Sequence, residues 1–425
     1  MDVPENAILR FSYLGFASQE IAVEKRKVID VVMDEGEKIE PAKPVDLTIK
    51  QIEKVEANNN FAFKMFREVS KSEGVNTFFS PFSLNMALGM LYNGSSGNTR
   101  TEIAKVLGIT DLSESQINDY YQKMSQVLLK IDPLTEVIIA NSIWYSNIIQ
   151  VKDSFIETGK KYFDADVQAL DFNNSNAARI INSWCADKTK NRINYITDNP
   201  DSDYMVYLIN ALYFKSKWHS EKRFDKAQTK LDDFTKTNSQ KIKVNLMEQT
   251  TYMPYYDDEH LQCVEMAYGN DAFNMLAILP AEGTNINRLI EYLDNIKFKN
   301  TVSNMQGQRV WLKLPRFKIE SGIQLNQPLM NSGMKQIFDG NVVKFTNITD
   351  TFLYVSNIKQ KTFVEVNEEG TEAAAVTSVI TVGYGIKRTP TEPVRFFANR
   401  PFLFLIREKS TGVILFIGRI DEPKE

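Results

Sequence analysis

Histidine and cysteine are both scarce in this 425-residue sequence, which contains two of each. Hydrolytic and metal-dependent catalysis usually draws on histidine, yet neither His219 nor His260 has a neighbour at metal-ligand spacing. The sequence also lacks GxSxG, P-loop, GxGxxG and HExxH motifs. We therefore expect no metal site and no enzymatic activity, and we interpret both histidines as structural.

Other absences narrow the class further. Cys185 and Cys263 lie far apart without CxxC spacing, so we expect two separate reduced thiols in the core instead of a disulfide or a zinc site. No run of 18 apolar residues occurs, which excludes a membrane-spanning helix. A formal net charge of -4 argues against a nucleic-acid partner.

The remaining composition predicts a large globular core, since 43% of the residues are hydrophobic and 26 are phenylalanine. Residues 1–50 mix charged residues and prolines, so we interpret them as an N-terminal extension. Helical periodicity follows over residues 52–69, 83–91 and 101–107, whereas residues 310–314 and 358–366 alternate as strands. Two apolar runs, 401–406 and 413–417, predict a buried terminal hairpin. Helices first and strands later indicate an α+β fold.

Signals for secretion are mixed. The first 30 residues lack a basic segment followed by an apolar core, so either a signal peptide has been removed or the protein is intracellular. Asn93, Asn173 and Asn347 begin glycosylation sequons, which are compatible with a secreted, extracellular glycoprotein.

Residues 368–377 have an unusual composition, with two acids, a glycine, Thr-Glu and three alanines after a strand that ends at Val366. A short surface helix capped by Thr371 is one interpretation. The β-branched run that follows, and Gly383 and Gly385 beyond it, oppose a helix. Some 20 residues then have no obvious partner, and loops of that length are usually functional or disordered.

This segment resembles the proximal hinge and reactive-centre loop of an inhibitory serpin, and in particular of secreted invertebrate serpins. The resemblance covers about 370 residues, from near residue 50 to the end. It rests on the order and spacing of four further segments, namely Phe78-Phe79-Ser80-Pro81-Phe82-Ser83, Leu208-Ile209-Asn210-Ala211-Leu212-Tyr213-Phe214-Lys215-Ser216-Lys217-Trp218, Leu314-Pro315-Arg316-Phe317 and Ala398-Asn399-Arg400-Pro401-Phe402-Leu403-Phe404.

The resemblance implies a serpin fold, with an N-terminal helical bundle, three β-sheets and an exposed reactive-centre loop at about residues 370–395. The serpin domain would span 51–421 and leave a C-terminal tail at 422–425. The implied activity is suicide inhibition of a serine protease, in which the cut loop inserts as a strand into the main sheet and traps the acyl-enzyme. A kinetically trapped monomer that needs no cofactor is expected.

The implied hinge consists of Glu368, Glu369, Gly370, Thr371, Glu372, Ala373, Ala374 and Ala375. Alternation along an inserted strand would turn Thr371, Ala373, Ala375 and Thr377 inward and leave Glu372, Ala374 and Val376 outside. Small inward residues meet little resistance, while a buried charge would cost several kcal/mol. Gly370 would supply the backbone freedom to turn the strand.

The resemblance also implies a polar region where the main sheet parts, to which we assign Ser80, Ser83, Asn210, Gln360 and Trp218. Family members commonly have histidine at the position of Gln360. Glutamine can still donate and accept hydrogen bonds there, so the departure bears on the pH sensitivity of opening and not on the mechanism.

Two ways of counting place the scissile bond differently. Counting forward from Glu368 places Tyr384 before the cut, which suits a chymotrypsin-like enzyme, whereas counting back from Asn399 places Lys387 there, beside Arg388. The loop is then about three residues longer than usual, and each extra residue adds roughly 3.3 Å of tether. Gly385 and Pro390 favour an exposed turn around the basic pair. We favour a trypsin-like protease of a proteolytic cascade, such as those of innate immunity.

Three alternatives remain. A sulfated polysaccharide such as heparin is a candidate accelerator, although residues 113–131 contain only Lys123 and Lys130; the other basic clusters are Lys188, Lys190 and Arg192, and Lys215 with Lys217. A non-inhibitory serpin that acts as a carrier, storage protein or chaperone is the second, and the alanine-rich hinge speaks against it. A hydrolytic enzyme is the third, opposed by the scarcity of histidine.

Overall fold

The computed structural model describes residues 8–11, 19–22, 26, 29, 31, 40–72, 76–219, 223–371 and 392–425. Its α-helices are α1 (Ile49–Ser72), α2 (Pro81–Gly94), α3 (Gly97–Leu107), α4 (Glu114–Leu128), α5 (Asp153–Phe163), α6 (Ala177–Lys188), α7 (Ile286–Tyr292), α8 (Asn295–Ser303) and α9 (Asn326–Asn331). Its strands are β1 (Ile8–Phe11), β2 (Gln19–Ala22), β3 (Thr77–Phe79), β4 (Thr135–Ser146), β5 (Ala165–Leu170), β6 (Val206–Lys217), β7 (Lys230–Thr235), β8 (Lys241–Asp257), β9 (Leu261–Ala267), β10 (Phe273–Pro280), β11 (Gln306–Pro315), β12 (Phe317–Gln324), β13 (Val355–Asn367), β14 (Gly370–Thr371), β15 (Val394–Phe397), β16 (Phe402–Glu408) and β17 (Ile414–Ile420).

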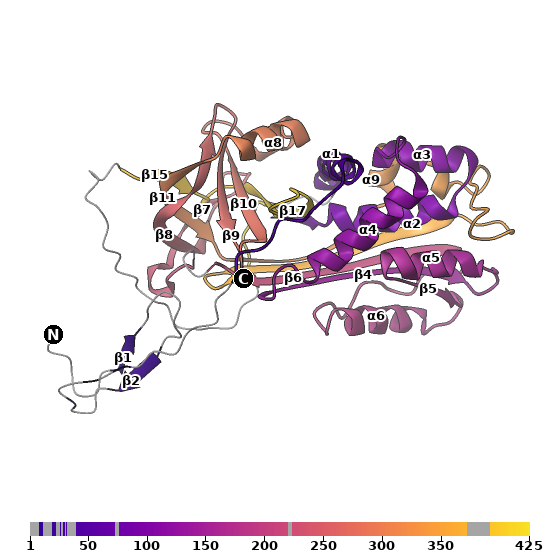
Figure 1. Ribbon diagram of the computed structural model, residues 1–425, viewed down its shortest axis with the longest axis horizontal. Helices are drawn as coiled ribbons and strands as arrows, with labels where there is room; N and C mark the ends of the chain where they lie inside the picture. Colours follow the sequence, from indigo (N-terminus) through magenta and orange to yellow (C-terminus); the bar gives the residue numbers. More distant parts are fainter. Residues whose placement is uncertain are drawn as a thin grey trace.

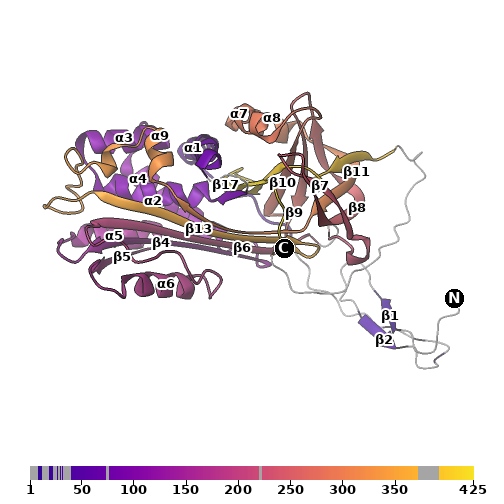
Figure 2. The ribbon, with the colours of Figure 1, turned by 180° about the vertical axis from the view of Figure 1, so that it is seen from behind.

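A six-stranded sheet with the order β12-β13-β14-β6-β4-β5 runs the length of the molecule. Helix α2 lies over one face of its long strands and α6 over the other, as Figures 1 and 2 show. Strand β6 therefore contributes to two cores: Leu208 and Leu212 belong to the main core, while Tyr207 and Ile209 pack in the smaller core under α6. Burial on both faces explains why β6 reads as a continuous apolar run.

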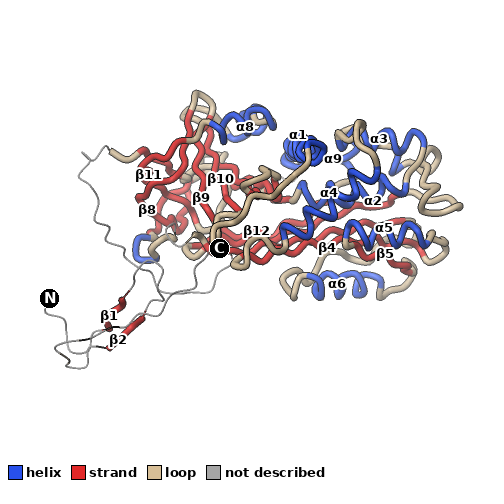
Figure 3. The backbone as a smooth tube through the Cα atoms, in the orientation of Figure 1, coloured by secondary structure: helices blue, strands red, loops and turns tan. Residues whose placement is uncertain are grey.

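A second sheet fills the other end of the molecule (Figure 3), with the order β15-β11-β8-β9-β10-β16-β17-β3 and β7 paired to β8. Three sheets were expected from the family resemblance, but two of them run together here. The cause is the long strand β8, which pairs with β7 and β11 over most of its length and with β9 at Tyr255–Asp257. The α+β class itself is confirmed.

The terminal hairpin and the buried helix were predicted correctly. Strands β16 and β17 pair antiparallel, and β3 joins their far edge. The ring of Phe78 on β3 stacks between Phe404 and Phe416, with centroids 5.4 and 5.2 Å away. Immediately afterwards, the Ser80 hydroxyl accepts a bond from the Ser83 amide and caps α2, in which every residue is buried. The segment that leads into α2 is thus held on both sides.

Hydrogen bonds join the chain before α1 to the body, and one of them runs from Lys123 Nζ to the Asp46 carbonyl. The Ala42 amide donates to the Asn270 carbonyl at 3.2 Å, and the Val45 amide donates to the Ser410 hydroxyl at 2.9 Å. Cys185 and Cys263 are both buried free thiols, as expected. Among the described residues, no helix is both long and apolar enough to cross a membrane.

Candidate functional site

The hinge begins where β13 ends, and its first residues already form a strand. Gly370 and Thr371 (β14) pair with Asn367 and Val366 of β13 on one side and with Lys217 and Ser216 of β6 on the other. Further along, β13 and β6 pair directly in parallel, from Phe363 opposite Tyr213 to Val355 opposite Val206. The sheet is therefore parted by two residues at this end and closed along the rest. Thr371 is therefore part of a strand, and the residues of the alternative helix that it would cap lie outside the described residues.

Gly370 occupies a position where a side chain does not fit. Its φ of +145° is one that residues with a side chain rarely adopt. A Cβ there would lie 2.1 Å from the Ser216 carbonyl oxygen and 2.6 Å from the Lys217 Cα. These neighbours are backbone atoms of β6, which cannot move aside independently of the sheet. Entry of the chain between the two strands therefore requires glycine.

Thr371 faces the interior. Its side chain is fully buried, and its hydroxyl lies 2.7 Å from the Tyr268 hydroxyl. The Tyr268 ring stacks on Trp218 with centroids 4.4 Å apart. The Trp218 indole N–H donates to the Asn367 carbonyl at 2.9 Å, so the end of β13, the hinge strand and the second sheet meet at one point.

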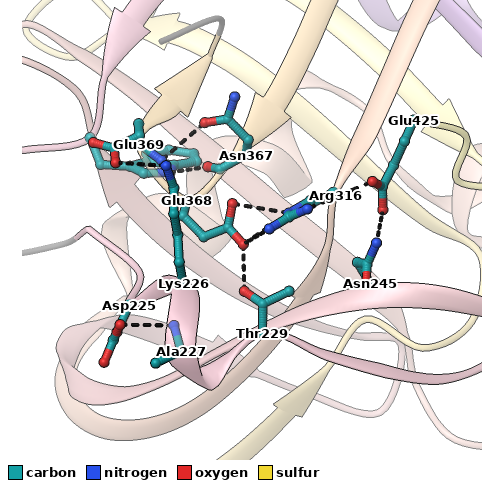
Figure 4. Close-up of polar contacts among 11 residues, drawn as sticks. Asp225, Lys226, Ala227, Thr229, Asn245, Arg316, Asn367, Glu368, Glu369 and Glu425 are labelled. Atoms are coloured by element: carbon teal, nitrogen blue, oxygen red, sulfur yellow. Dashed lines mark hydrogen bonds and ion pairs between the residues drawn. The ribbon is translucent and has the colours of Figure 1, made fainter. Parts of the chain in front are cut away.

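Glu368 carries the main electrostatic contact of the hinge (Figure 4). Its carboxylate is 2% exposed and accepts bonds from Arg316 Nε at 2.9 and 3.0 Å and from Arg316 Nη2 at 2.6 Å. The Thr229 hydroxyl also donates to it. Burial alone would raise the pKa of Glu368, but the bonds from Arg316 and Thr229 hold that pKa below its usual value. The sequence motif that contains Arg316 and the hinge are thus one structural unit.

The surroundings of this ion pair are also polar. Arg316 Nη1 lies 3.7 Å from a Glu425 carboxylate oxygen, and Asn245 Nδ2 donates to Glu425 at 2.7 Å. Glu369 lies 3.4 Å from Lys226, and its carbonyl accepts from the Trp218 amide at 2.8 Å. A groove of about 400 Å³ beside the hinge is lined by the charged members of this set, namely Lys226, Arg316, Glu368, Glu369 and Glu425.

A second polar group lies in the closed part of the sheet. Gln360 on β13 sits opposite Asn210 on β6, and its amide donates to Asn210 Oδ1 at 2.6 Å. The same side chain accepts from the Ser80 amide at 2.7 Å and donates to the Ser80 carbonyl at 3.0 Å. Hydrogen bonds of Gln360 therefore connect β13 and β6, the two strands between which the sheet is parted, to the start of α2.

Asn210 extends these contacts to β4. Its amide nitrogen donates to Ser83 Oγ and to Asn141 Oδ1, and the Ser83 hydroxyl also donates to Asn141 at 3.4 Å. Ser80, Ser83, Asn141, Asn210 and Gln360, which we call the closure cluster, are each no more than 2% exposed. Asn141 was not among the predicted residues, because nothing in its local sequence marks its place opposite Asn210.

Trp218 was predicted to lie with Ser80, Ser83, Asn210 and Gln360 where the main sheet parts, and it is found at the parted end of the sheet. Its partners are Asn367, Tyr268 and Phe224, at the hinge. Asn367 is seven residues beyond Gln360 on β13, which corresponds to roughly 23 Å along a strand. The structure therefore places Trp218 with the hinge and the other four predicted residues in the closure cluster.

Several predicted site residues lie outside the described residues: Glu372, Ala373, Ala374 and Ala375 of the hinge, and the scissile-bond candidates Tyr384, Lys387 and Arg388. Of the three sequons, Asn173 and Asn347 are exposed. Asn93 is 6% exposed within α2, and its amide donates to Gly89 and Asn118. A glycan on Asn93 does not fit the folded chain.

The basic clusters differ in how they are paired. Lys188 contacts Asp166 at 2.7 Å, Lys190 contacts Glu136, and Arg192 lies over the Tyr213 ring at 5.7 Å. Carboxylates thus neutralise two of the three cations of this cluster. Lys215 and Lys217 are on β6 at the parted end of the sheet.

Known proteins match the chain over most of its length. The family model for Serpin (serine protease inhibitor) matches residues 56–423. Iripin-2 of Ixodes ricinus is 32% identical over 86% of this chain and 92% of its own length, and human Serpin B3 is 34% identical over 87% and 99%.

Solved structures agree. The native thermophilic serpin tengpin superimposes with a TM-score of 0.81 at 31% identity, covering 90% of this chain and 96% of its own. Native protease nexin-1, solved with heparin, gives 0.79 at 26% identity and covers 88% and 100%. The chain belongs to the serpin family, whose members are mostly protease inhibitors and are not catalytic enzymes.

The Arg316–Glu368 pair predicts a pH-dependent contribution to stability. Replacing Arg316 with Met leaves a buried carboxylate without its cation and should cost about 2 kcal/mol at neutral pH. The native pKa of Glu368 is lowered, so the contribution is present above the unfolded pKa of roughly 4.3 and is lost as pH falls below it. Thermal unfolding of wild type and Arg316→Met should therefore differ at neutral pH and converge in acid.

Lys318→Met is the matched control, because Lys318 lines the same groove without a recorded carboxylate partner among the described residues. It should unfold like the wild type. An equal loss of stability in both variants, or a difference that persists unchanged in acid, would contradict the assigned role of Arg316.

The closure cluster predicts that Gln360→His makes sheet opening pH-sensitive. A histidine buried at this point should have a pKa below its unfolded value of roughly 6.5, so the closed sheet loses stability as pH falls below that value. Gln360→Leu removes the same hydrogen bonds without adding a titrating group. Thermal midpoints measured across this pH range should fall in acid for the histidine variant only; parallel curves for both variants would refute the prediction.

Proposed function

We propose that this serpin irreversibly inhibits a trypsin-like serine protease by inserting its cleaved reactive-centre loop between β13 and β6. The observation that carries the proposal is the strand Gly370–Thr371, which is paired on both sides in the uncleaved chain. Insertion would lengthen an existing strand, which avoids the nucleation of a new one. The same step would exchange the parallel β13–β6 pairing for two antiparallel pairings.

In the proposed reaction, the protease serine attacks the carbonyl carbon of the residue before the scissile bond, here called the bait residue. The peptide C–N bond then breaks. The C-terminal fragment leaves as a new amine, and the bait residue remains as an ester on the serine. Insertion of residues 372 onward would then pull the acylated protease along the sheet before water hydrolyses the ester. The protein would act as a substrate whose reaction stops at the acyl-enzyme, before the ester is hydrolysed.

The seating of Thr371 supports the proposed side-chain alternation. With Thr371 buried against Tyr268, a strand continued from it would turn Ala373 and Ala375 inward and Glu372 and Ala374 outward. The inward positions thus hold small residues and the acid stays solvated. Non-inhibitory carrier or storage function remains the second candidate within the family, and the small inward residues disfavour it.

The proposed target is trypsin-like because Lys387 and Arg388 suit an S1 pocket with a buried acid. A cut after Tyr384 by a chymotrypsin-like enzyme is the alternative. We further propose that the protein acts in a secreted proteolytic cascade as a monomer, with Asn173 and Asn347 as its accessible sequons. Heparin-like acceleration is a weaker proposal, because Asp166 and Glu136 pair with cations of one basic cluster.

Incubation with trypsin, with chymotrypsin and without protease tests the proposal. A band on a denaturing gel at the summed mass of protease and cut inhibitor is expected with trypsin, and the released peptide should begin at Arg388 or Thr389. A peptide beginning at Gly385 would instead identify Tyr384 as the bait. Loop cleavage without any covalent band, across a panel of serine proteases, would overturn the inhibitory function.

Two neighbouring alanines test the alternation. Ala375→Arg places a charge on the inward face of the inserted strand and should convert the inhibitor into a substrate, with several-fold or greater loss of covalent complex. Ala374→Arg, one residue away on the outward face, should still form the complex. The ratio of complexed to cleaved protein measures both, and equal ratios in the two variants would contradict the proposed strand register.

A further inference from the structure

Close to residue 392, where the described chain resumes, strands β8, β11 and β15 present an exposed aromatic and basic surface. We call it the sheet-end patch, and it consists of Tyr252, Arg309, Trp311 and Arg395. Arg309 is in register with Tyr252 across β8 and β11, and Trp311 is in register with Arg395 across β11 and β15. Residues opposed in this way project from the same face at about 5 Å separation.

The tryptophan of the patch is held in place by several contacts. The Trp311 ring packs edge-on against Phe397, with centroids 5.0 Å apart and an interplanar angle of 85°, and its indole N–H donates to Glu248 at 2.7 Å. The Arg395 guanidinium lies 5.8 Å from the same ring. Tyr252, in contrast, is 60% exposed. The patch thus offers a fixed indole beside an exposed phenol.

The two arginines carry charge that neighbouring acids do not neutralise. Lys313, two residues beyond Trp311 on β11, forms salt bridges with two nearby carboxylates. Its Nζ atom lies 3.1 Å from Asp232 and 3.9 Å from Glu248. Arg309 and Arg395 are exposed, and within the described part of the chain neither has a recorded ion pair with a carboxylate. Guanidinium groups bind carboxylates through two parallel hydrogen bonds, so the patch fits an acidic protein surface.

The position of the patch relative to the loop indicates which protein would cover it. Arg388 precedes Val394, the first residue of β15, by six residues, which span at most about 20 Å. A compact protease domain of about 220 residues has a radius of gyration near 17 Å. An enzyme whose cleft holds Lys387 or Arg388 is therefore tethered close enough to contact the end of this sheet.

We propose that the sheet-end patch is a secondary docking surface for the target protease, which it recognises through an acidic region beside the protease's catalytic cleft. This inference rests on the proposed function, because it needs a protease at the loop. Arginine, tryptophan and tyrosine dominate the binding energy of protein interfaces, whereas a polyanion would select a cluster of basic groups without the aromatics. The patch would add association rate and selectivity that the loop sequence alone does not supply.

The test separates docking from trapping. The rate at which a protease consumes the intact loop, counted as covalent complex plus cleaved product, measures docking, and the ratio of the two products measures trapping. The variant is Arg309→Ser with Arg395→Ser, and the control is Lys160→Ser with Arg179→Ser, which removes the same charge from exposed positions on α5 and α6. Trypsin and a panel of trypsin-like proteases are compared at several salt concentrations.

For the protease that wild type consumes fastest, the patch variant should lose roughly tenfold in rate at low salt and show a flatter salt dependence, with an unchanged product ratio. The control should match wild type. A patch variant that keeps the control's rate and salt dependence would overturn the inference, as would patch-dependent heparin binding without any change in protease rate. Fast, patch-dependent cleavage without covalent complex would instead refute the proposed inhibition and leave the docking surface supported.

Discussion

The parallel pairing of β13 with β6 holds the main sheet closed, and the rest of the site is arranged around that pairing. Gln360 and Asn210 lock it in its middle, in a buried cluster that extends to α2 and β4. At its end, Gly370 and Thr371 have already separated the two strands. The two strands are thus separated by two residues at one end of the sheet and hydrogen-bonded to each other a few residues further on, which is compatible with the insertion that we propose.

Local sequence patterns predicted most of the fold. Alternation over residues 358–366, the apolar runs of the terminal hairpin and the buried helix after Ser80 all reflect periods of two or 3.6 residues, and these are local properties. The joining of two expected sheets through β8 was not predicted, because it depends on which strands a long strand pairs with and not on its own pattern.

The contacts of the candidate site were harder to predict for the same reason. Arg316 and Glu368 are 52 residues apart, and each was noticed as part of a separate family motif without any sign that they form one ion pair. Asn141 has no local signature, and the motif that contains both Asn210 and Trp218 gave no sign that these two residues belong to separate groups of contacts. The sequence was enough to single out most of these residues, whereas their contact partners depend on how distant strands pair in the fold.

Thr371 has a consequence for how the loop tolerates changes in length. Because its side chain is already seated against Tyr268, the phase of any strand that grows from it is set before growth begins. One residue added between Thr371 and Ala375 would exchange the inward and outward sets and bring a charged or larger side chain into the sheet. The same addition near Lys387 would leave the phase intact and alter only the reach of the bait. Under the insertion that we propose, the loop would therefore tolerate added residues poorly beside the hinge and well beside the bond that a protease would cut.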